Sequence, residues 1–381
     1  MGPLEGVRVL EIEAIGPVPW CGMMLADMGA DVLRVDRPKD PTGLPPPPDR
    51  FQFAKRGRRA VVADLKRPAA VQGVLKLAAR ADILIEGMRP GVMERIGLGP
   101  APCLAVNPRL VFGRMTGWGQ DGPLAQKAGH DINYIALAGA LHAIGPEGEA
   151  PVPPLNLLGD YAGGGMLLAL GVCAALVNAR ATGQGQVVDA AMIDGVASLM
   201  APLFGQFAAG QWKDDRCSNT LDGAAPWYGV YQTADGKFLA VGAVESQFYA
   251  QLVAGLGLEI DRLPPRDRRD RWAATRQVFA ERIRTRTRDE WVKVFADVDA
   301  CVSPVLSLQE AQQEAHQRAR GTHREWHGML QPSPAPRFSR TPSQVSAPPC
   351  PRGAGGRAAL AEWGLEAAEI GQSGFDFDER A

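Results

Sequence analysis

The chain has 381 residues, which allows two or three domains at about 100–200 residues each. Apolar residues make up 46% and charged residues 22%, which is the balance of an ordinary globular protein and excludes a low-complexity chain. The formal net charge is −1, which excludes a protein that wraps nucleic acid, because such proteins neutralise phosphates with an excess of basic side chains.

The first 120 residues alternate strand-like and helix-like patterns. The expected strands cover residues 7–12, 31–36, 60–65, 82–86 and 110–115. Helices are expected at 20–28 and 69–80, and a proline-rich loop is expected at 41–48. Strands separated by helices of about 10–15 residues are typical of βαβ units, whose strands run parallel. We therefore predict the α/β class, with a large Rossmann-like domain built on a parallel sheet.

A buried helix is expected at 163–180. Its apolar run, 162–177, is shorter than the about 20 residues that span a bilayer, so we expect no membrane insertion. The first residues lack the basic and then apolar pattern of a signal peptide. The six cysteines lie far apart without a Cys-x-x-Cys pair, which is typical of reduced thiols. These features predict a cytoplasmic protein.

The second half of the chain has a different pattern. Residues 227–241 contain two strand-like runs around an Asp-Gly turn and predict a hairpin. Thr287-Arg-Asp-Glu290 is a capping box and predicts a helix start. A proline-rich extended segment, 332–352, leads to a last expected helix at 358–370.

These patterns predict four parts of the chain. They are the first part of the large domain (1–200), a linker (201–224), a small α+β domain (225–305), and a linker with a C-terminal return to the large domain (306–381).

Gly117-Trp-Gly-Gln-Asp-Gly122 matches the dinucleotide fingerprint G-x-G-x-x-G. Pro123 follows directly, however, and no clear helix pattern opens there. A glycine-rich loop at an active site is therefore favoured over a binding site for NAD or FAD.

Basic residues are concentrated between residues 34 and 67, where ten basic and four acidic side chains leave a local charge of +6. Arg37 follows the end of an expected parallel strand, where open α/β sheets bind ligands. Arginine also forms bidentate contacts with phosphate. Charge alone leaves two interpretations open, a site for a phosphorylated ligand and a solvated basic loop.

His130 and Asp160 each lie at the expected start of a helix. A polar residue at that position is more often a cap than a catalyst, so neither position alone indicates chemistry.

Several segments resemble the family III CoA-transferase (CaiB–BaiF) superfamily. They are residues 6–11, 24–38, 85–91, 115–123 and 185–192. Within that superfamily, residues 129–134, 154–160 and 241–249 closely resemble the α-methylacyl-CoA racemase family. The resemblance extends from about residue 3 to residue 343.

The resemblance implies an isomerase that epimerises the α-carbon of 2-methylacyl-CoA thioesters, (2R) to (2S) and back. The proton would pass between two bases through an enolate. The resemblance assigns His130 to one face of the substrate and Asp160 to the other, with Glu245 beside Asp160. Asn156 and Asp131 would orient these groups.

The resemblance also implies the residues that hold CoA. They are Arg37, Ala63, Asp64, Leu65, Lys66, Met88, Arg89, Pro90, Arg95, Gly129, Ile132, Asn133 and Tyr134. CoA is the carrier part of the substrate, so no cofactor or metal is implied. The resemblance further implies an interlocked homodimer, in which Glu245 reaches the Asp160 site across the subunits.

Two other functions remain as alternatives. A family III CoA-transferase would use Asp160 as a nucleophile and form an acyl anhydride, but it needs no base at the position of His130. A CoA-binding scaffold without activity is disfavoured by the joint presence of His130, Asp160 and Glu245.

Overall fold

The computed structural model describes residues 2–39, 45 and 47–377, and the chain divides into two compact units. The first unit comprises the chain up to Ala138, Leu155–Leu199 and the chain from Arg320 onward; the second comprises Gly139–Pro154 and Met200–Ala319. The second unit is thus larger than the predicted small domain, because it also takes in the predicted linker 201–224 and residues 139–154. Most of the predicted loop at 41–48 lies outside the described residues.

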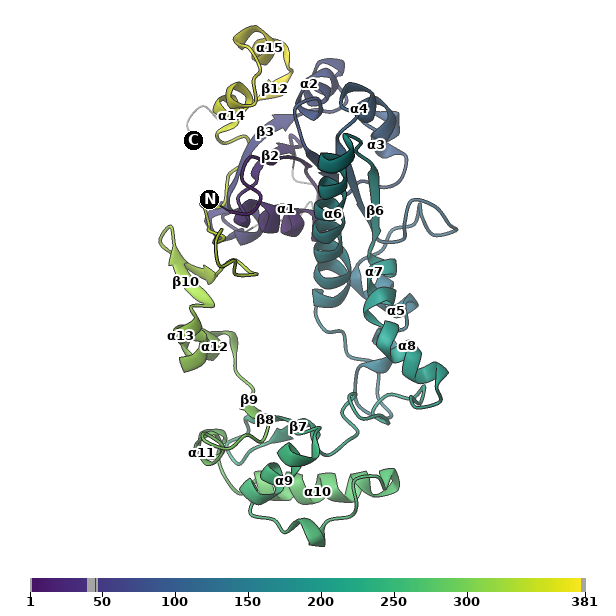
Figure 1. Cartoon of the computed structure of the whole chain (residues 1–381), viewed down its shortest axis with the longest axis vertical. Coiled ribbons are helices and arrows are strands. Elements are labelled where there is room, and N and C mark those ends of the chain that lie inside the picture. The colour runs from purple at the N-terminus through teal and green to yellow at the C-terminus, as the bar shows by residue number, and fades with distance from the viewer. Residues whose placement is uncertain (1, 40–44, 46, 378–381) are drawn as a thin grey trace. The chain divides into compact units, whose positions relative to one another are not determined.

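Within the described residues, the first unit is built on a seven-stranded sheet with the order β12-β3-β2-β1-β4-β5-β6. Strands β2, β3, β6 and β12 of this sheet are labelled in Figure 1. The strands from β3 to β6 pair in parallel, and β12 joins β3 antiparallel at one edge. The strands are β1 (Arg8–Ile12), β2 (Asp31–Asp36), β3 (Arg58–Ala63), β4 (Ile83–Glu86), β5 (Val111–Thr116), β6 (Val187–Ala191) and β12 (Phe375–Asp376). The predicted α/β fold with a large parallel sheet is confirmed, whereas β6 and β12 were not predicted.

Helices cover both faces of this sheet, which explains why its central strands are apolar on both sides. On one face, Leu10 and Leu33 belong to a core that includes residues of α2, α4, α14 and α15. On the other face, Val9 and Val32 pack with residues of α1 and α6. The helices of this unit are α1 (Pro17–Asp27), α2 (Pro68–Ala78), α3 (Val92–Arg95), α4 (Pro100–Val106), α5 (Asp131–Leu137), α6 (Leu167–Thr182), α7 (Met192–Leu199), α14 (Gly356–Glu362) and α15 (Ala367–Gln372).

The helix predicted at 163–180 is longer in the structure and only partly buried. A π-helix, η4 (Leu157–Met166), leads directly into α6. On the outer face of α6, the side chains of Leu170 and Val177 are 65% and 71% exposed, so the prediction of a buried helix is wrong for that face. By length and composition alone, Leu157–Thr182 could cross a membrane, although half of its most apolar window is buried in the protein. The core helices of other globular proteins can have the same length and apolar composition.

The second unit contains a three-stranded antiparallel sheet within its described residues. Strands β7 (Tyr228–Gln232) and β8 (Phe238–Gly242) form the predicted hairpin, and β9 (Val302–Pro304) pairs with β8. The predicted capping box is also confirmed, because Thr287 and Glu290 exchange hydrogen bonds at the start of α11. The helices are α8 (Ala201–Ala208), α9 (Ser246–Gly255), α10 (Trp272–Ile283), α11 (Arg288–Val294), α12 (Leu308–Gln313) and α13 (Ala315–Arg320).

The C-terminal part belongs to the first unit and begins with a hairpin of β10 (His323–Trp326) and β11 (Met329–Pro332). The single helix predicted at 358–370 is wrong, because two short helices, α14 and α15, occupy this region. Gly364 separates them with a φ of 86°, a left-handed backbone conformation that ends a helix.

Candidate active site

A cavity of about 530 Å³ opens beyond the carboxyl ends of β1, β4 and β5. Ligands bind at this edge in open α/β sheets, because the loops after the strands converge there. The cavity is lined by the loop that leads into α1, the loop after β4, the end of β5, the N-terminus of α5 and the start of η4. Both predicted bases, His130 and Asp160, line it, as do Gly129, Tyr134 and Asn156.

Asp131 fixes the relative positions of His130 and Asp160, which lie far apart in the sequence. His130 is the N-cap residue of α5, and Asp131 is the first residue of that helix. The buried carboxylate of Asp131 accepts the backbone N–H groups of Gly159 at 2.6 Å and Asp160 at 2.8 Å. The contact requires a glycine at 159, because a Cβ there would lie 2.6 Å from Asp131 Oδ2. Asp131 therefore joins α5 to η4 and does not line the cavity itself.

The carboxyl group of Asp160 is partly buried beside the cavity, and its burial raises its pKa. Asn156 opposes this effect by donating a hydrogen bond at 3.0 Å to Oδ2. The charge of Asp131 raises the pKa further, and His130 lowers it. A carboxyl group with a raised pKa retains its proton more readily near neutral pH, which is what a general acid requires.

Gly16 brings the backbone of the loop after β1 against Asp160. A Cβ at this position would lie 3.3 Å from Asp160 Oδ2, and the residue has a φ of 66° that favours glycine. The sequence pattern indicates only a helix breaker at Gly16, so its place in the site was not predicted. Thr116, Lys127, Tyr161 and Met192 line the same cavity and were not predicted either.

A second cavity, of about 750 Å³, adjoins the first, because Ile15, Gly87, Met88 and Arg89 line both. Among the residues predicted to hold CoA, those that line the second cavity are Arg37, Ala63, Asp64, Leu65, Lys66, Met88 and Arg89. Lys39, which was not predicted, lines it as well. The basic side chains give this cavity the charge that a phosphorylated group needs.

Six of the residues predicted to hold CoA do not line this second cavity, and two of them, Gly129 and Tyr134, line only the first. Pro90 lines only the first cavity, and Arg95 lines neither. Ile132 and Asn133 line neither cavity, and the Asn133 side chain instead accepts the backbone N–H of His130. Glu245 lies in the second unit, where it is the exposed N-cap residue of α9.

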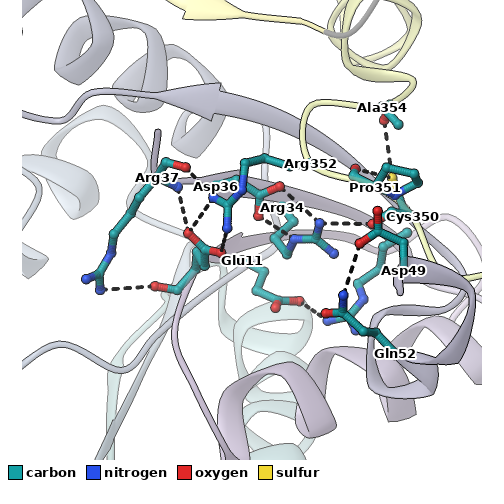
Figure 2. Close-up of polar contacts among 12 residues, drawn as sticks. Glu11, Arg34, Asp36, Arg37, Asp49, Gln52, Cys350, Pro351, Arg352 and Ala354 are labelled. Atoms are coloured by element: carbon teal, nitrogen blue, oxygen red, sulfur yellow. Dashed lines mark hydrogen bonds and ion pairs between the residues drawn. The ribbon is translucent and has the colours of Figure 1, made fainter. Parts of the chain in front are cut away.

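Much of the basic stretch between residues 34 and 67 is engaged in internal ion pairs. Arg34 pairs with Asp36 at 2.5 Å, with both side chains buried (Figure 2). Arg58 pairs with Glu11, also at 2.5 Å and also buried. Arg56 makes a similar buried pair with Asp27. Arg58 joins β3 to β1, Arg56 joins the start of β3 to α1, and the ion pair of Arg34 stays within β2. All three are buried, so the interpretation as a solvated loop is wrong for them. They do not line the second cavity either.

Among the described residues, no group of His, Cys, Asp and Glu side chains is placed to hold a metal ion. The six cysteines are free thiols, and three of them are buried.

Comparison with known proteins shows the family to which the chain belongs. The chain is 46% identical over 345 residues to mouse alpha-methylacyl-CoA racemase, which covers 90% of this chain and 88% of that protein. It is 44% identical to the human alpha-methylacyl-CoA racemase, over 89% of this chain and 87% of that protein. The crystal structure of a CAIB/BAIF family protein from Brucella suis aligns over 95% of this chain and 99% of that chain, with a TM-score of 0.82 and 25% identity. The profile of CoA-transferase family III matches residues 4–355, and the chain belongs to this family.

Proposed function

We propose that the protein epimerises the α-carbon of 2-methylacyl-CoA thioesters, from (2R) to (2S) and back. One observation carries the proposal: His130 and Asp160 line a single cavity that adjoins a basic cavity through the loop after β4. The high identity with two racemases over most of the chain supports the same reaction.

The chemistry requires groups of the types found in the first cavity. The α-hydrogen of a thioester is weakly acidic, so its removal needs a positioned base and stabilisation of the enolate oxygen. Inversion then needs an acid that returns a proton to the opposite face of the enolate. His130 and Asp160 are the two groups that we assign to these faces. Histidine suits this role because its unperturbed pKa of about 6.5 makes both protonation states accessible near neutral pH.

Asp160 must be protonated in one direction of the reaction and ionised in the other. The environment of Asp160 favours the proton, because burial raises its pKa, and the hydrogen bond from Asn156 limits that effect. We assign Glu245 to the same face of the substrate, where two neighbouring carboxyl groups would share one proton.

The second cavity is the place that we assign to the nucleotide end of CoA. Arg37, Lys39 and Lys66 line it and supply positive charge for the phosphates. Met88 and Arg89 line both cavities, so the pantetheine arm would pass along this loop to bring the thioester to His130 and Asp160.

We propose that the active protein is an interlocked homodimer, with Glu245 supplied by the partner subunit. Each unit exposes apolar side chains that a monomer would leave in water. In the first unit they include Leu155, Met166, Leu170 and Val177, and in the second they include Phe204 and Phe207. A second copy that covers the outer face of α6 would also account for the apolar character of this helix without membrane insertion.

The reaction leaves the oxidation state of the substrate unchanged, and both proton-transfer groups are side chains. We therefore propose that no cofactor is needed beyond the CoA of the substrate itself. The free cysteines support the cytoplasmic location that we propose, because thiols stay reduced there.

The test is to incubate one purified 2-methylacyl-CoA epimer with the protein and separate the products by chiral chromatography. A racemase produces the other epimer without any added acid. A family III CoA-transferase would leave the epimer unchanged until a carboxylic acid acceptor is added, and would then transfer CoA to that acid. The second result would refute the proposed function.

A further inference from the structure

We propose that Arg352 and Glu13 form a positioning pair that fixes Arg37 at the nucleotide cavity. No function is predicted from the sequence for the chain after residue 346. The inference rests on the proposed function, because it assumes that the second cavity binds the nucleotide of CoA.

Glu13 is buried at the carboxyl end of β1, next to the point where β2 leads into Arg37. Its carboxylate accepts the backbone N–H of Arg37 at 2.7 Å. The Arg37 guanidinium in turn donates to the backbone carbonyl of Glu13 at 3.3 Å. Glu13 therefore contacts Arg37 twice, once through the Glu13 carboxylate and once through the Glu13 backbone carbonyl.

Arg352 completes this arrangement from the far end of the chain. Its guanidinium forms a bidentate pair with Glu13, at 2.7 and 3.0 Å. It also donates to the backbone carbonyl of Arg37, and Figure 2 shows these two arginines side by side. The backbone N–H and the backbone carbonyl of Arg37 are thus both held by this pair of residues. Only 5% of the Glu13 side chain and 27% of the Arg352 side chain are exposed, so the pair is partly desolvated and stronger than a surface pair.

The segment that carries Arg352 is itself anchored on the sheet. Arg34 donates to the backbone carbonyl of Cys350 (Figure 2). The backbone N–H of Ala60 donates to the backbone carbonyl of Ala354. Gly57 donates its backbone N–H to Ala347. These contacts hold the segment beside β2 and β3. They therefore fix the position of the Arg352 backbone relative to Glu13.

The Arg37 side chain can still donate hydrogen bonds to a ligand. It lines the second cavity, and its guanidinium carries five N–H donors, of which Nη2 donates to the backbone carbonyl of Glu13. A guanidinium binds phosphate in the bidentate mode through two of its N–H groups. Positioning of Arg37 should therefore affect recognition of the nucleotide and leave the chemistry at His130 and Asp160 unchanged.

The test compares two thioesters of the same 2-methyl acid. One is the CoA ester, and the other is the N-acetylcysteamine ester, which lacks the nucleotide. For Arg352→Met, we expect KM for the CoA ester to rise about tenfold with kcat nearly unchanged, as loss of one charge-assisted contact predicts. We expect kcat/KM for the N-acetylcysteamine ester to stay at the wild-type value. Arg340→Met removes an exposed arginine from the same segment and serves as the matched control, with no change for either ester.

Other variants keep the test decisive if Arg352→Met does not fold. Arg352→Lys retains the positive charge but loses the planar guanidinium that pairs with a carboxylate in the bidentate mode. We expect a smaller rise in KM for the CoA ester in this variant. In Arg37→Met, a further Arg352→Met change should add little, because both act on one contact. Free CoA should bind the Arg352 variants more weakly by a similar factor in calorimetry.

Two results would overturn the inference. One is an equal loss of kcat/KM for both esters, which indicates a general structural role. The other is an unchanged KM for the CoA ester. If the wild-type protein epimerises neither ester, the proposed function fails, and this outcome is distinct from a failure of the positioning pair.

Discussion

At the scale of single residues, the environment of Asp160 distinguishes it from an ordinary helix cap. Asn156 and Asp131 both hold Asp160, through its side chain and its backbone respectively. Its backbone N–H donates to Asp131, and Asp160 lines the cavity with a carboxyl group whose pKa is raised by burial. The prediction of a helix start at Asp160 is wrong, because η4 begins at Leu157 and Asp160 lies inside it. Asp131, from another helix, accepts the free backbone N–H groups of its first turn.

Replacement of either base should abolish epimerisation. We expect His130→Gln and Asp160→Asn each to lower kcat by roughly 10²–10⁴-fold, which is the usual contribution of a positioned acid or base. Any residual exchange of the C2 hydrogen should be confined to one epimer in each variant, and to opposite epimers in the two. Chiral chromatography and NMR of the two variants check this. Residual exchange from the same epimer in both would contradict the assignment of the bases to opposite faces.

Gly16→Ala should impair catalysis through Asp160. The new Cβ would crowd Oδ2 at 3.3 Å, and a backbone with φ 66° and ψ −113°, which L side chains rarely adopt, would add about 1–3 kcal/mol of strain. Gly6 is a matched control, because it has a φ of 79° and a Cβ added there would have nothing within 4 Å. We expect both variants to lose thermal stability and only Gly16→Ala to lose kcat. Equal activity of the two variants would show that Gly16 does not shape the site.

At the scale of elements, the loop after β4 connects the two cavities and is held by a buried charge network. Glu86, the last residue of β4, accepts the backbone N–H of Met88 at 2.6 Å and pairs with Arg114 of β5 at 3.0 Å. Arg114 also pairs with Glu94 of α3. Gln126 donates to the backbone carbonyl of Pro90 and holds the other end of the loop.

This network makes the stability of the first unit depend on pH. Burial raises the pKa of Glu86 to about 7, while Met88 and Arg114 oppose the shift and Glu94 adds to it. The folded state therefore holds the Glu86 proton at pH values where the unfolded chain has lost it. Glu86 contributes stability below pH 4.5, and this contribution is lost as the pH rises through about 7.

We expect Glu86→Gln to remove this dependence. Between about pH 4.5 and pH 7, the free energy of unfolding of the variant relative to the wild type should rise by up to about 1.4 kcal/mol per pH unit, and its thermal midpoint should rise with it. Glu147→Gln, which changes an exposed glutamate, should follow the wild-type curve at every pH. A constant difference between Glu86→Gln and the wild type across this range would show that Glu86 does not titrate there.

Local sequence signals predicted the elements that they control and missed those that depend on distant partners. The alternating apolar runs, the Asp-Gly turn and the capping box at Thr287 are local, and they predicted the parallel sheet, the hairpin and α11. Strand β12 has only two residues and forms through its pairing with β3. Helix η4 begins before the glycine run because Asp131 caps it from another element. The burial of Arg58 likewise depends on Glu11, 47 residues away.

At the scale of the whole molecule, the site that we propose requires two subunits. His130 and Asp160 belong to the first unit and Glu245 to the second, and both units expose apolar side chains. In an interlocked dimer, each complete site would combine the first unit of one subunit with Glu245 of the other.

Complementation tests this arrangement directly. Asp160→Asn and Glu245→Gln should each be impaired as homodimers. A heterodimer of the two contains one site with both changes and one intact site. Random mixing should therefore restore about a quarter of the wild-type activity, since half of the dimers are mixed and each has one intact site. No recovery in verified heterodimers would show that Glu245 acts within its own subunit.

Proton transfer at C2 is the central claim, and deuterium exchange measures it directly. Each pure epimer of a 2-methylacyl-CoA is incubated with the wild-type protein in D₂O and followed by NMR and chiral chromatography. We expect deuterium to enter C2 from either starting epimer, both epimers to form, and the thioester to stay intact. Complete retention of the α-hydrogen while the other epimer appears, or release of CoA to an acceptor acid without exchange, would contradict this claim.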